Sequence, residues 1–261
     1  ISTYSATAPL TAFAKKYNFR GATLHGVNEI ILSSGLAVDY NEVSKEAEKL
    51  RSGMTKADAV EIDFDVLGEK ATLRLELGKQ EAQKSHGLCR GTEPDVANLP
   101  AGEVYYVPRD AQGAFPLKHE DGTIGLMTVE NCRITAARLL KGDQKTLDEY
   151  MERVAVDPLF GTLGELGFGT QALPVSGQDI QDEKILGTMH VATGRSDHLG
   201  GDITPDRFHE KSNASHEDIL FAPHKTPEVQ VPQVRMYRDG KVEVLIENFK
   251  PAAFMQGLLA N

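Results

Sequence analysis

The chain's strongest candidates for chemistry lie between Glu165 and Asp218. Glu165 stands in an apolar stretch rich in glycine, His190 stands in an apolar run, and one residue separates His216 from Asp218. Imidazole nitrogens and carboxylate oxygens are the ligands that catalytic divalent metals need, and such sites leave positions open for water and substrate. The pattern therefore predicts metal-dependent chemistry.

Each of these residues also has a purely structural interpretation. Glu103 follows Pro100 and Gly102 at the start of a predicted strand, where an exposed glutamate is common. Glu165 must lie either on a solvent face or buried beside a partner, because burying an unpaired charge costs several kcal/mol. A lone histidine in an apolar run, such as His190, is either a hydrogen-bonded core residue or a ligand.

The pair His216 and Asp218 strengthens the metal interpretation. In an extended segment, residues two apart project to the same face, so this imidazole and this carboxylate can converge on one ion. In a loop, the same pair would be a surface hydrogen bond. The signal therefore lies in the joint occurrence of the donors.

Other polar residues of this region are less decisive. Residues 182–184, Asp-Glu-Lys, fit a helix start with acids at the positive end of its dipole, or a carboxylate that orients His190. His198, His209 and His224 have no partner pattern in the sequence, and we interpret them as bystanders.

Composition limits the classes to which the protein can belong. Its 261 residues carry a formal net charge of −10 without a cluster of Lys and Arg, which argues against nucleic acid as a partner. No apolar run approaches the roughly 20 residues of a membrane span. The two cysteines, Cys89 and Cys132, lack metal-site spacing, so we expect N and O ligands and a reducing cytoplasm.

Hydrophobic periodicity predicts an α+β chain with mostly antiparallel strands. Apolar residues at helical spacing predict helices over residues 8–17, 41–54 and 143–156. Alternation and turn residues predict strands over residues 20–24, 60–66, 72–77, 103–107, 125–134, 234–237 and 242–246. Within this set, 60–66 with 72–77 and 234–237 with 242–246 are expected to form hairpins.

At these residues the chain resembles the thermophilic metallo-aminopeptidase family, the aminopeptidase T and aminopeptidase S type of leucyl aminopeptidase. The matching motifs occur in the family's order at residues 98–104, 164–169, 182–192, 200–201 and 216–218. The resemblance implies a mostly antiparallel, barrel-like metal-binding domain with flanking helices, preceded by the tail of an N-terminal α/β domain. It assigns residues 1–39 to that tail and 40–261 to the catalytic domain, so we expect a fragment or a trimmed member.

Carried over motif by motif, the family's metal ligands fall on Glu103, Glu165, His190, His216 and Asp218. The resemblance implies two divalent ions of Zn, Co or Mn, and a homodimer. A carboxylate not fully used in ligation, Glu165 or Glu183, would carry the proton to the leaving amine. The family's tyrosine after the first histidine is absent, and Asp197 or His198 would stand in its place.

Three functions follow from these observations. The leading interpretation is a metal-dependent hydrolase that removes N-terminal amino acids from peptides with a metal-activated water. The second rests on a further resemblance, since pyridine-ring-cleaving dioxygenases are similar to this superfamily and share the His-x-Asp pair. It is a ring-cleaving dioxygenase with one Fe(II) on the two-histidine, one-carboxylate set His190, His216 and Asp218. The third is a catalytically inactive member that binds a ligand. We expect a peptide or small-molecule substrate, with neither nucleic acid nor membrane as a partner.

Overall fold

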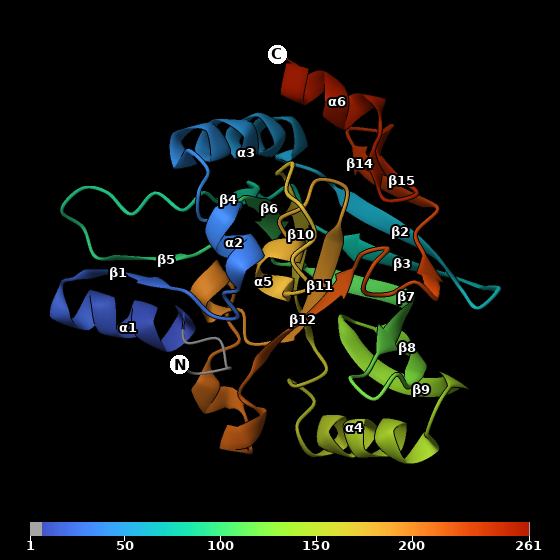
Figure 1. The fold of residues 1–261 in the computed structure, drawn as a ribbon. Helices are drawn as coiled ribbons and strands as arrows, with labels where there is room; N and C mark the ends of the chain where they lie inside the picture. The colour runs from blue at the N-terminus through green and yellow to red at the C-terminus, as the bar shows by residue number, and fades with distance from the viewer. Residues whose placement is uncertain (1–6, 261) are drawn as a thin grey trace.

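The larger of two antiparallel sheets forms one side of the molecule (Figure 1). The computed structural model describes residues 7–260. This sheet has nine strands, and β13 (Val229–Gln230) pairs with β2 beside the main order. That order is β16 (Lys250–Pro251), β15 (Lys241–Glu247), β14 (Gln233–Arg238), β2 (Ala59–Val66), β3 (Glu69–Glu76), β7 (Asp110–Lys118), β8 (Ile124–Glu130) and β9 (Arg133–Lys141).

The smaller antiparallel sheet holds the most deeply buried strands. Its five strands are, in order, β12 (His216–Phe221), β11 (Met189–Gly194), β10 (Leu163–Gly169), β6 (Glu103–Tyr106) and β4 (Gln83–Ser85). Every residue of β10 and β11 is buried, so these two strands read as continuous apolar or small-residue runs without alternation. A charged residue within them must therefore have a partner.

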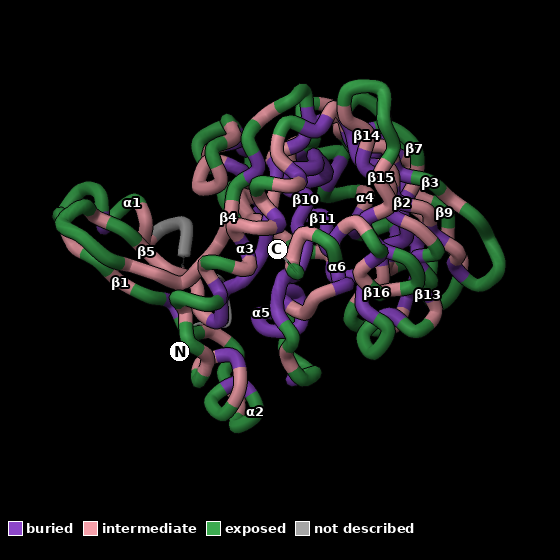
Figure 2. Tube along the Cα trace, turned by 90° about the horizontal axis from the view of Figure 1, so that it is seen from above, coloured by how far each residue is buried: buried purple, intermediate pink, exposed green. Residues whose placement is uncertain are grey.

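A small lobe stands beside these sheets, at the left in Figure 1. It contains α1 (Thr7–Tyr17) and a parallel pair formed by β1 (Arg20–Thr23) and β5 (Asp95–Asn98). Figure 2 shows its backbone as mostly intermediate or exposed, whereas buried residues gather in the two larger sheets. Since β1 pairs with a strand far beyond residue 39, the boundary at that residue stays a prediction.

The helices form where capping and periodicity favour them. α3 (Tyr40–Met54) is capped by Asp39 and buries a face of four apolar residues, and α4 (Gln144–Val156) is capped by Asp143. α6 (Ala253–Ala260) packs so closely on α3 that a Cβ at Gly53 would overlap Leu258. The remaining helices are α2 (Glu29–Ser33) and α5 (Asp179–Asp182), with 3₁₀ turns at Asp197–Leu199, Pro205–Arg207 and Lys211–Asn213. No helix within residues 7–260 is long and apolar enough to span a membrane.

One apolar core joins the two sheets. The alternating residues of β2 point inward, and Phe64 of β2 packs against Phe221 of β12 with ring centroids 4.8 Å apart. Burying a side chain of this size stabilises the fold by roughly 1.5–3 kcal/mol. The core therefore fixes the end of β12, the strand that begins with His216.

The α+β class and the mostly antiparallel pairing are confirmed, with two differences in detail. Residues 125–134, predicted as one strand, form the hairpin of β8 and β9, because Asn131 and Cys132 adopt positive φ angles and turn the chain. Within the described residues both sheets are open, ending at β16 and β9 and at β12 and β4, so they do not close into the expected barrel-like form.

Candidate metal centre

Four neighbouring strands of the smaller sheet carry the predicted ligands. These are Glu103 at the start of β6, Glu165 in β10, His190 in β11, and His216 and Asp218 in β12. In the register of the sheet Glu165 pairs with Ala192, which pairs in turn with Asp218. Strand alternation places His216 and Asp218 on one face, as predicted.

The carboxylate of Glu165 lies between the two histidines. Its Oε2 is 2.9 Å from Nε2 of His216, and its Oε1 is 3.6 Å from Nε2 of His190. Oδ1 of Asp218 is 3.2 Å from the same nitrogen of His216. Oε2 of Glu103 is 3.8 Å from Nε2 of His190. Each histidine therefore has its own second carboxylate and shares Glu165 with the other.

Two groups of possible metal ligands result from this arrangement. Glu103, Glu165 and His190 offer atoms that all lie within 4.8 Å of one another, and so do Glu165, His216 and Asp218. Glu165 belongs to both groups. The ions of a two-metal site lie roughly 3.5–4 Å apart, a separation that a shared carboxylate can bridge.

Glycines of β10 leave the space that the site needs. Gly167 pairs with His190 across the sheet, and a Cβ at Gly167 would overlap Cε1 and Nε2 of the His190 ring. A Cβ at Gly169 would likewise overlap backbone atoms of Lys184 and Ile185. The glycine-rich sequence around Glu165 thus reflects the close approach that was predicted there.

Hydrogen bonds orient the two imidazoles differently. Nδ1 of His216 donates to the backbone carbonyl of Arg195 at 2.6 Å, which directs Nε2 toward Glu165 and Asp218. A partner of this kind commonly fixes the ring of a metal-binding histidine. Nδ1 of His190 is buried and has no hydrogen-bond partner in the described chain. The contacts therefore do not support an orienting role toward His190 for the carboxylates of residues 182–184.

Electrostatics couples the shared carboxylate to the imidazoles. Burial opposes the charge of Glu165, but its contacts with His190 and His216 outweigh burial and lower its pKa to about 2. Burial disfavours the charge of His190, yet Glu165 outweighs it and raises the His190 pKa to about 10. Against the same burial, Asp218 and Glu165 raise the pKa of His216 well above its usual value. Without a metal, both imidazoles therefore carry protons at pH 7.

Lys184 is a member of the site that the sequence did not reveal. Its side chain is 2% exposed, and Nζ lies 2.8 Å from Oε2 of Glu103 and 2.5 Å from Oε1 of Glu183. Burial alone would lower the pKa of Lys184, but the two carboxylates outweigh burial and raise the pKa above its usual value. The ammonium therefore stays charged. Burial raises the pKa of Glu183 to about 7. A lysine after two acids is typical of an exposed helix end, which is why no signal marked it.

Asp182 anchors the segment that carries Glu183 and Lys184. It is the last residue of α5, so residues 182–184 do not start a helix, as one alternative had proposed. Its carboxylate accepts hydrogen bonds from the backbone N–H groups of Ser176 and Gly177 and from Nε2 of His224, the last at 2.8 Å. His224 thus contacts this anchor and none of the predicted ligands.

His198, interpreted from the sequence as a bystander, lines the cavity of the predicted ligands. Its ring stands edge-on to that of His216, with centroids 4.7 Å apart. Burial, and secondarily His216, lowers its pKa to about 4, so this imidazole is neutral at pH 7. Asp197 instead pairs with Arg195 at 3.0 Å. Of the two positions considered for the family's tyrosine, His198 is the one that lines the cavity.

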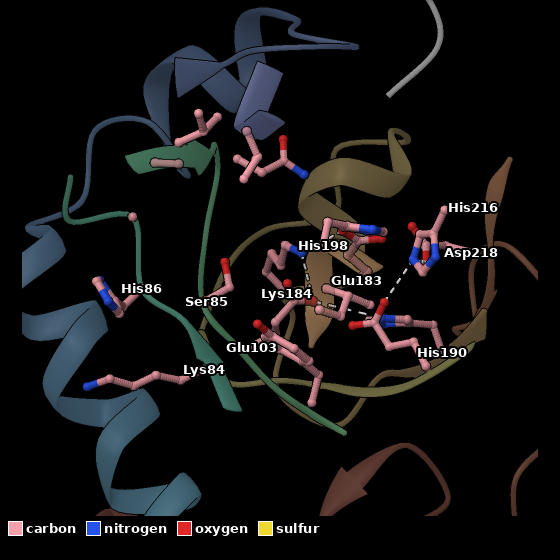
Figure 3. A pocket seen from close by; sticks show the side chains of 18 of the residues that line it. Lys84, Ser85, His86, Glu103, Glu183, Lys184, His190, His198, His216 and Asp218 are labelled. Carbon is pink, nitrogen blue, oxygen red and sulfur yellow. Dashed lines mark hydrogen bonds and ion pairs between the residues drawn. The ribbon is translucent and has the colours of Figure 1, made fainter. Parts of the chain in front are cut away.

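The predicted ligands form one end of a cavity of about 280 Å³. Figure 3 shows His190, His216 and Asp218 on one side of this cavity, with Ser85 and His86 on the opposite side. Ser85 is the last residue of β4, and β5 of the small lobe lines the cavity near it. Most of these side chains are polar, which suits a small polar ligand next to the donor cluster.

The donor set fits bound cations. At the ligand end of the cavity, the carboxylates of Glu103, Glu165, Glu183 and Asp218 gather around the ammonium of Lys184 when the imidazoles are neutral. An excess of buried negative charge costs free energy unless cations offset it. In the metal-free chain the protons on the histidines supply part of that charge, and divalent ions would replace them. Five N and O donors without a thiolate suit Zn, Co, Mn or Fe.

Comparison of the sequence with known protein families and with curated proteins finds no match. Solved structures with a similar fold include two that cover most of this chain. The first is 2,5-dihydroxypyridine dioxygenase from Pseudomonas putida KT2440, with a TM-score of 0.65 and 16% identity over 97% of this chain and 70% of that chain. The second is wild-type AmpT from Thermus thermophilus, with a TM-score of 0.50 and 19% identity over 82% of this chain and 53% of that chain.

These likenesses support the predicted fold and leave the reaction open. The chain spans about half the length of AmpT, whose name is that of the aminopeptidase T group. The chain spans 70% of the dioxygenase, and 97% of its own residues take part in the similarity. At sequence identities below 20%, these likenesses show a common fold and no more. The function must therefore be argued from the site itself.

Proposed function

We propose that this protein is an enzyme, a metal-dependent hydrolase that releases N-terminal residues from peptides. The observation that carries the proposal is the position of Glu165 between His190 and His216, with one carboxylate oxygen facing each ring. A shared carboxylate can bridge a pair of ions, whereas a single ion has no use for one. The arrangement therefore favours two divalent ions of Zn, Co or Mn.

The five predicted ligands divide into two sets that meet at Glu165. Glu103 and His190 complete one set, and His216 and Asp218 complete the other. When bound, such ions polarise a carbonyl oxygen and lower the pKa of a water molecule to about 7. The side chain of Asp218 is 33% exposed, so substrate can approach this end of the cluster.

Glu183 is the residue we assign to proton transfer. It lines the same cavity but belongs to neither ligand set, and a base must lie within reach of the proton that it moves. Burial raises its pKa to about 7, near the value at which a carboxyl both accepts and returns a proton at neutral pH. Lys184, at 2.5 Å, holds this carboxylate in place. Glu165, the other candidate, is committed to both histidines.

A ring-cleaving dioxygenase with one Fe(II) is the second candidate. The observation in its favour is the similarity of fold to 2,5-dihydroxypyridine dioxygenase over 97% of the chain. That reaction would need His190, His216 and Asp218 on one ion. In the described chain these three do not form a group with all donor atoms within 4.8 Å, because the histidines lie on opposite sides of Glu165. The hydrolase is therefore our first choice.

Metal content separates these functions. The protein is purified without added metal or chelator and analysed for its elements, and turnover of leucine amide is then measured. About two Zn, Co or Mn ions per chain with release of leucine support the hydrolase. About one Fe per chain supports the dioxygenase. Metal uptake without release of leucine, and without ring cleavage of 2,5-dihydroxypyridine in a parallel assay, would support an inactive, ligand-binding member.

Location and assembly stay predictions. Cysteine usage favours a cytoplasmic protein, and the family resemblance favours a homodimer. Light scattering of the metal-loaded protein measures its mass directly, and a monomer at micromolar concentration would contradict the dimer. We further expect no binding to nucleic acid, because the net charge is −10.

A further inference from the structure

A second, larger cavity is lined by all six residues of β12. Its volume is about 750 Å³, against about 280 Å³ for the cavity that holds the donor cluster. His216 and Asp218 line both cavities, and they are the only residues that the two linings share in the described chain. A molecule that extends past these two residues would therefore pass from one cavity into the other.

β12 is an edge strand beside this larger cavity. Within the described residues it pairs with β11 on one side and with no strand on the other. Its first four residues are partly or fully exposed. An edge strand presents a row of unpaired N–H and C=O groups, and extended peptides commonly bind by adding a strand there.

The opposite wall of the larger cavity comes from the end of β7 and from α4. It includes His119, which follows β7 directly, and Tyr150 and Arg153 of α4. The basic residues that line the larger cavity are already paired, Lys118 with Glu228, Arg153 with Glu217 and Lys225 with Asp179. The wall therefore suits an uncharged main chain better than a phosphate or another strong anion.

We propose that the larger cavity binds the peptide substrate beyond its first residue, as an added strand along the free edge of β12. This inference rests on the proposed hydrolase function and specifies its substrate as an extended oligopeptide. The first residue occupies the smaller cavity at the donor cluster, and the following residues pair with the main chain of β12. A single-ring substrate would need the smaller cavity alone.

The test compares substrates of different length on the metal-loaded protein. We expect kcat/KM for Leu-Ala-Ala-Ala to exceed that for leucine amide by about tenfold, through a lower KM, since a few main-chain hydrogen bonds give about 1.4 kcal/mol. Two further peptides carry an N-methyl group on the third or the fourth main-chain nitrogen. Alternate residues of a strand face the partner strand, so we expect one methylated peptide to lose the advantage and the other to keep it.

A variant tests the same cavity from the protein side. His119→Trp places a larger ring in the larger cavity, and we expect the ratio of the tetrapeptide to the leucine amide kcat/KM to fall to about one. The methylated peptides keep the test valid if this variant does not fold. Equal kcat/KM for both substrates in the unaltered protein, or equal loss for both methylated peptides, would overturn the edge-strand site. No release of leucine from either substrate would overturn the hydrolase itself.

Discussion

The ring of His190 occupies the space that the missing side chain of Gly167 leaves open. The two residues are paired across β10 and β11, and a Cβ at Gly167 would overlap Cε1 and Nε2 of the ring. Nε2 is the atom that faces both Glu103 and Glu165. The exact residue type at 167 therefore matters for the donor set although glycine carries no donor of its own.

Replacing this glycine tests the dependence directly. Gly167→Ala should push the His190 ring away from Glu165 and weaken metal binding at least about tenfold, as changes behind a metal ligand commonly do. Titration calorimetry with Zn²⁺ measures the loss. Gly257→Ala in α6 is the control, because a Cβ there meets nothing within 4 Å. Equal affinities for both variants would show that His190 does not bind metal.

A matched pair of glutamates tests whether Glu165 is shared. Glu165→Gln should remove a ligand from both ions and leave the chain with almost no bound metal, whereas Glu103→Gln should cost only one of about two ions. Elemental analysis after gel filtration counts the ions. The same stoichiometry in both variants would be inconsistent with a bridging role for Glu165.

Removing the buried lysine should destabilise the metal-free protein. Lys184→Met leaves the carboxylates of Glu103 and Glu183 buried without their common partner, and breaking such a pair costs about 3 kcal/mol. Urea unfolding in the presence of a chelator measures the change. Adding Glu183→Gln should recover a large part of the loss, because one unpaired charge is then gone. A fully additive double variant would show that the two residues do not interact.

An ion-pair cluster outside the candidate metal centre provides a pH-dependent prediction. Lys118 and Lys141 lie 2.8 and 2.9 Å from Glu228 and lower its pKa to about 2, from an ordinary value of 4.5. A lowered carboxyl pKa stabilises the folded state above pH 4.5, and this contribution is lost as the pH falls toward 2. Glu228→Gln should thus cost about 1 kcal/mol at pH 7 and almost nothing near pH 2.

Thermal unfolding between pH 2 and pH 7 gives this difference. The control is Glu152→Gln, which removes the same charge from an exposed glutamate of α4. A difference in stability between the Glu228 variant and the unaltered protein that stays constant across this pH range would contradict a lowered pKa for Glu228.

Part of the site could be predicted because its signals are local. The His-x-Asp spacing needs only an extended backbone to bring His216 and Asp218 together, and β12 supplies it. Glu165 stood out because an acid in an apolar, glycine-rich strand requires a partner. Local alternation likewise predicted the hairpin of β2 and β3.

The rest depends on contacts between distant segments. Lys184 lies beside Glu103 of β6, and His198 lies beside His216 of β12, so both contacts join segments that are distant in the sequence. Neither residue has an unusual local sequence that would mark it. The parallel pairing of β1 with β5 joins residues 20–23 to 95–98, which no local pattern announces. The turn at Asn131 and Cys132 lacks the glycine that normally marks a hairpin, so two strands looked like one.

The place of β12 at the border of its sheet has a kinetic consequence. His190 and Glu103 lie on strands with neighbours on both sides, whereas His216 and Asp218 lie on a strand with one neighbour in the described chain. Border strands separate from a sheet more often than interior ones. Two ions held by these sets would therefore leave at different rates, and the one next to Asp218 would exchange with the medium first.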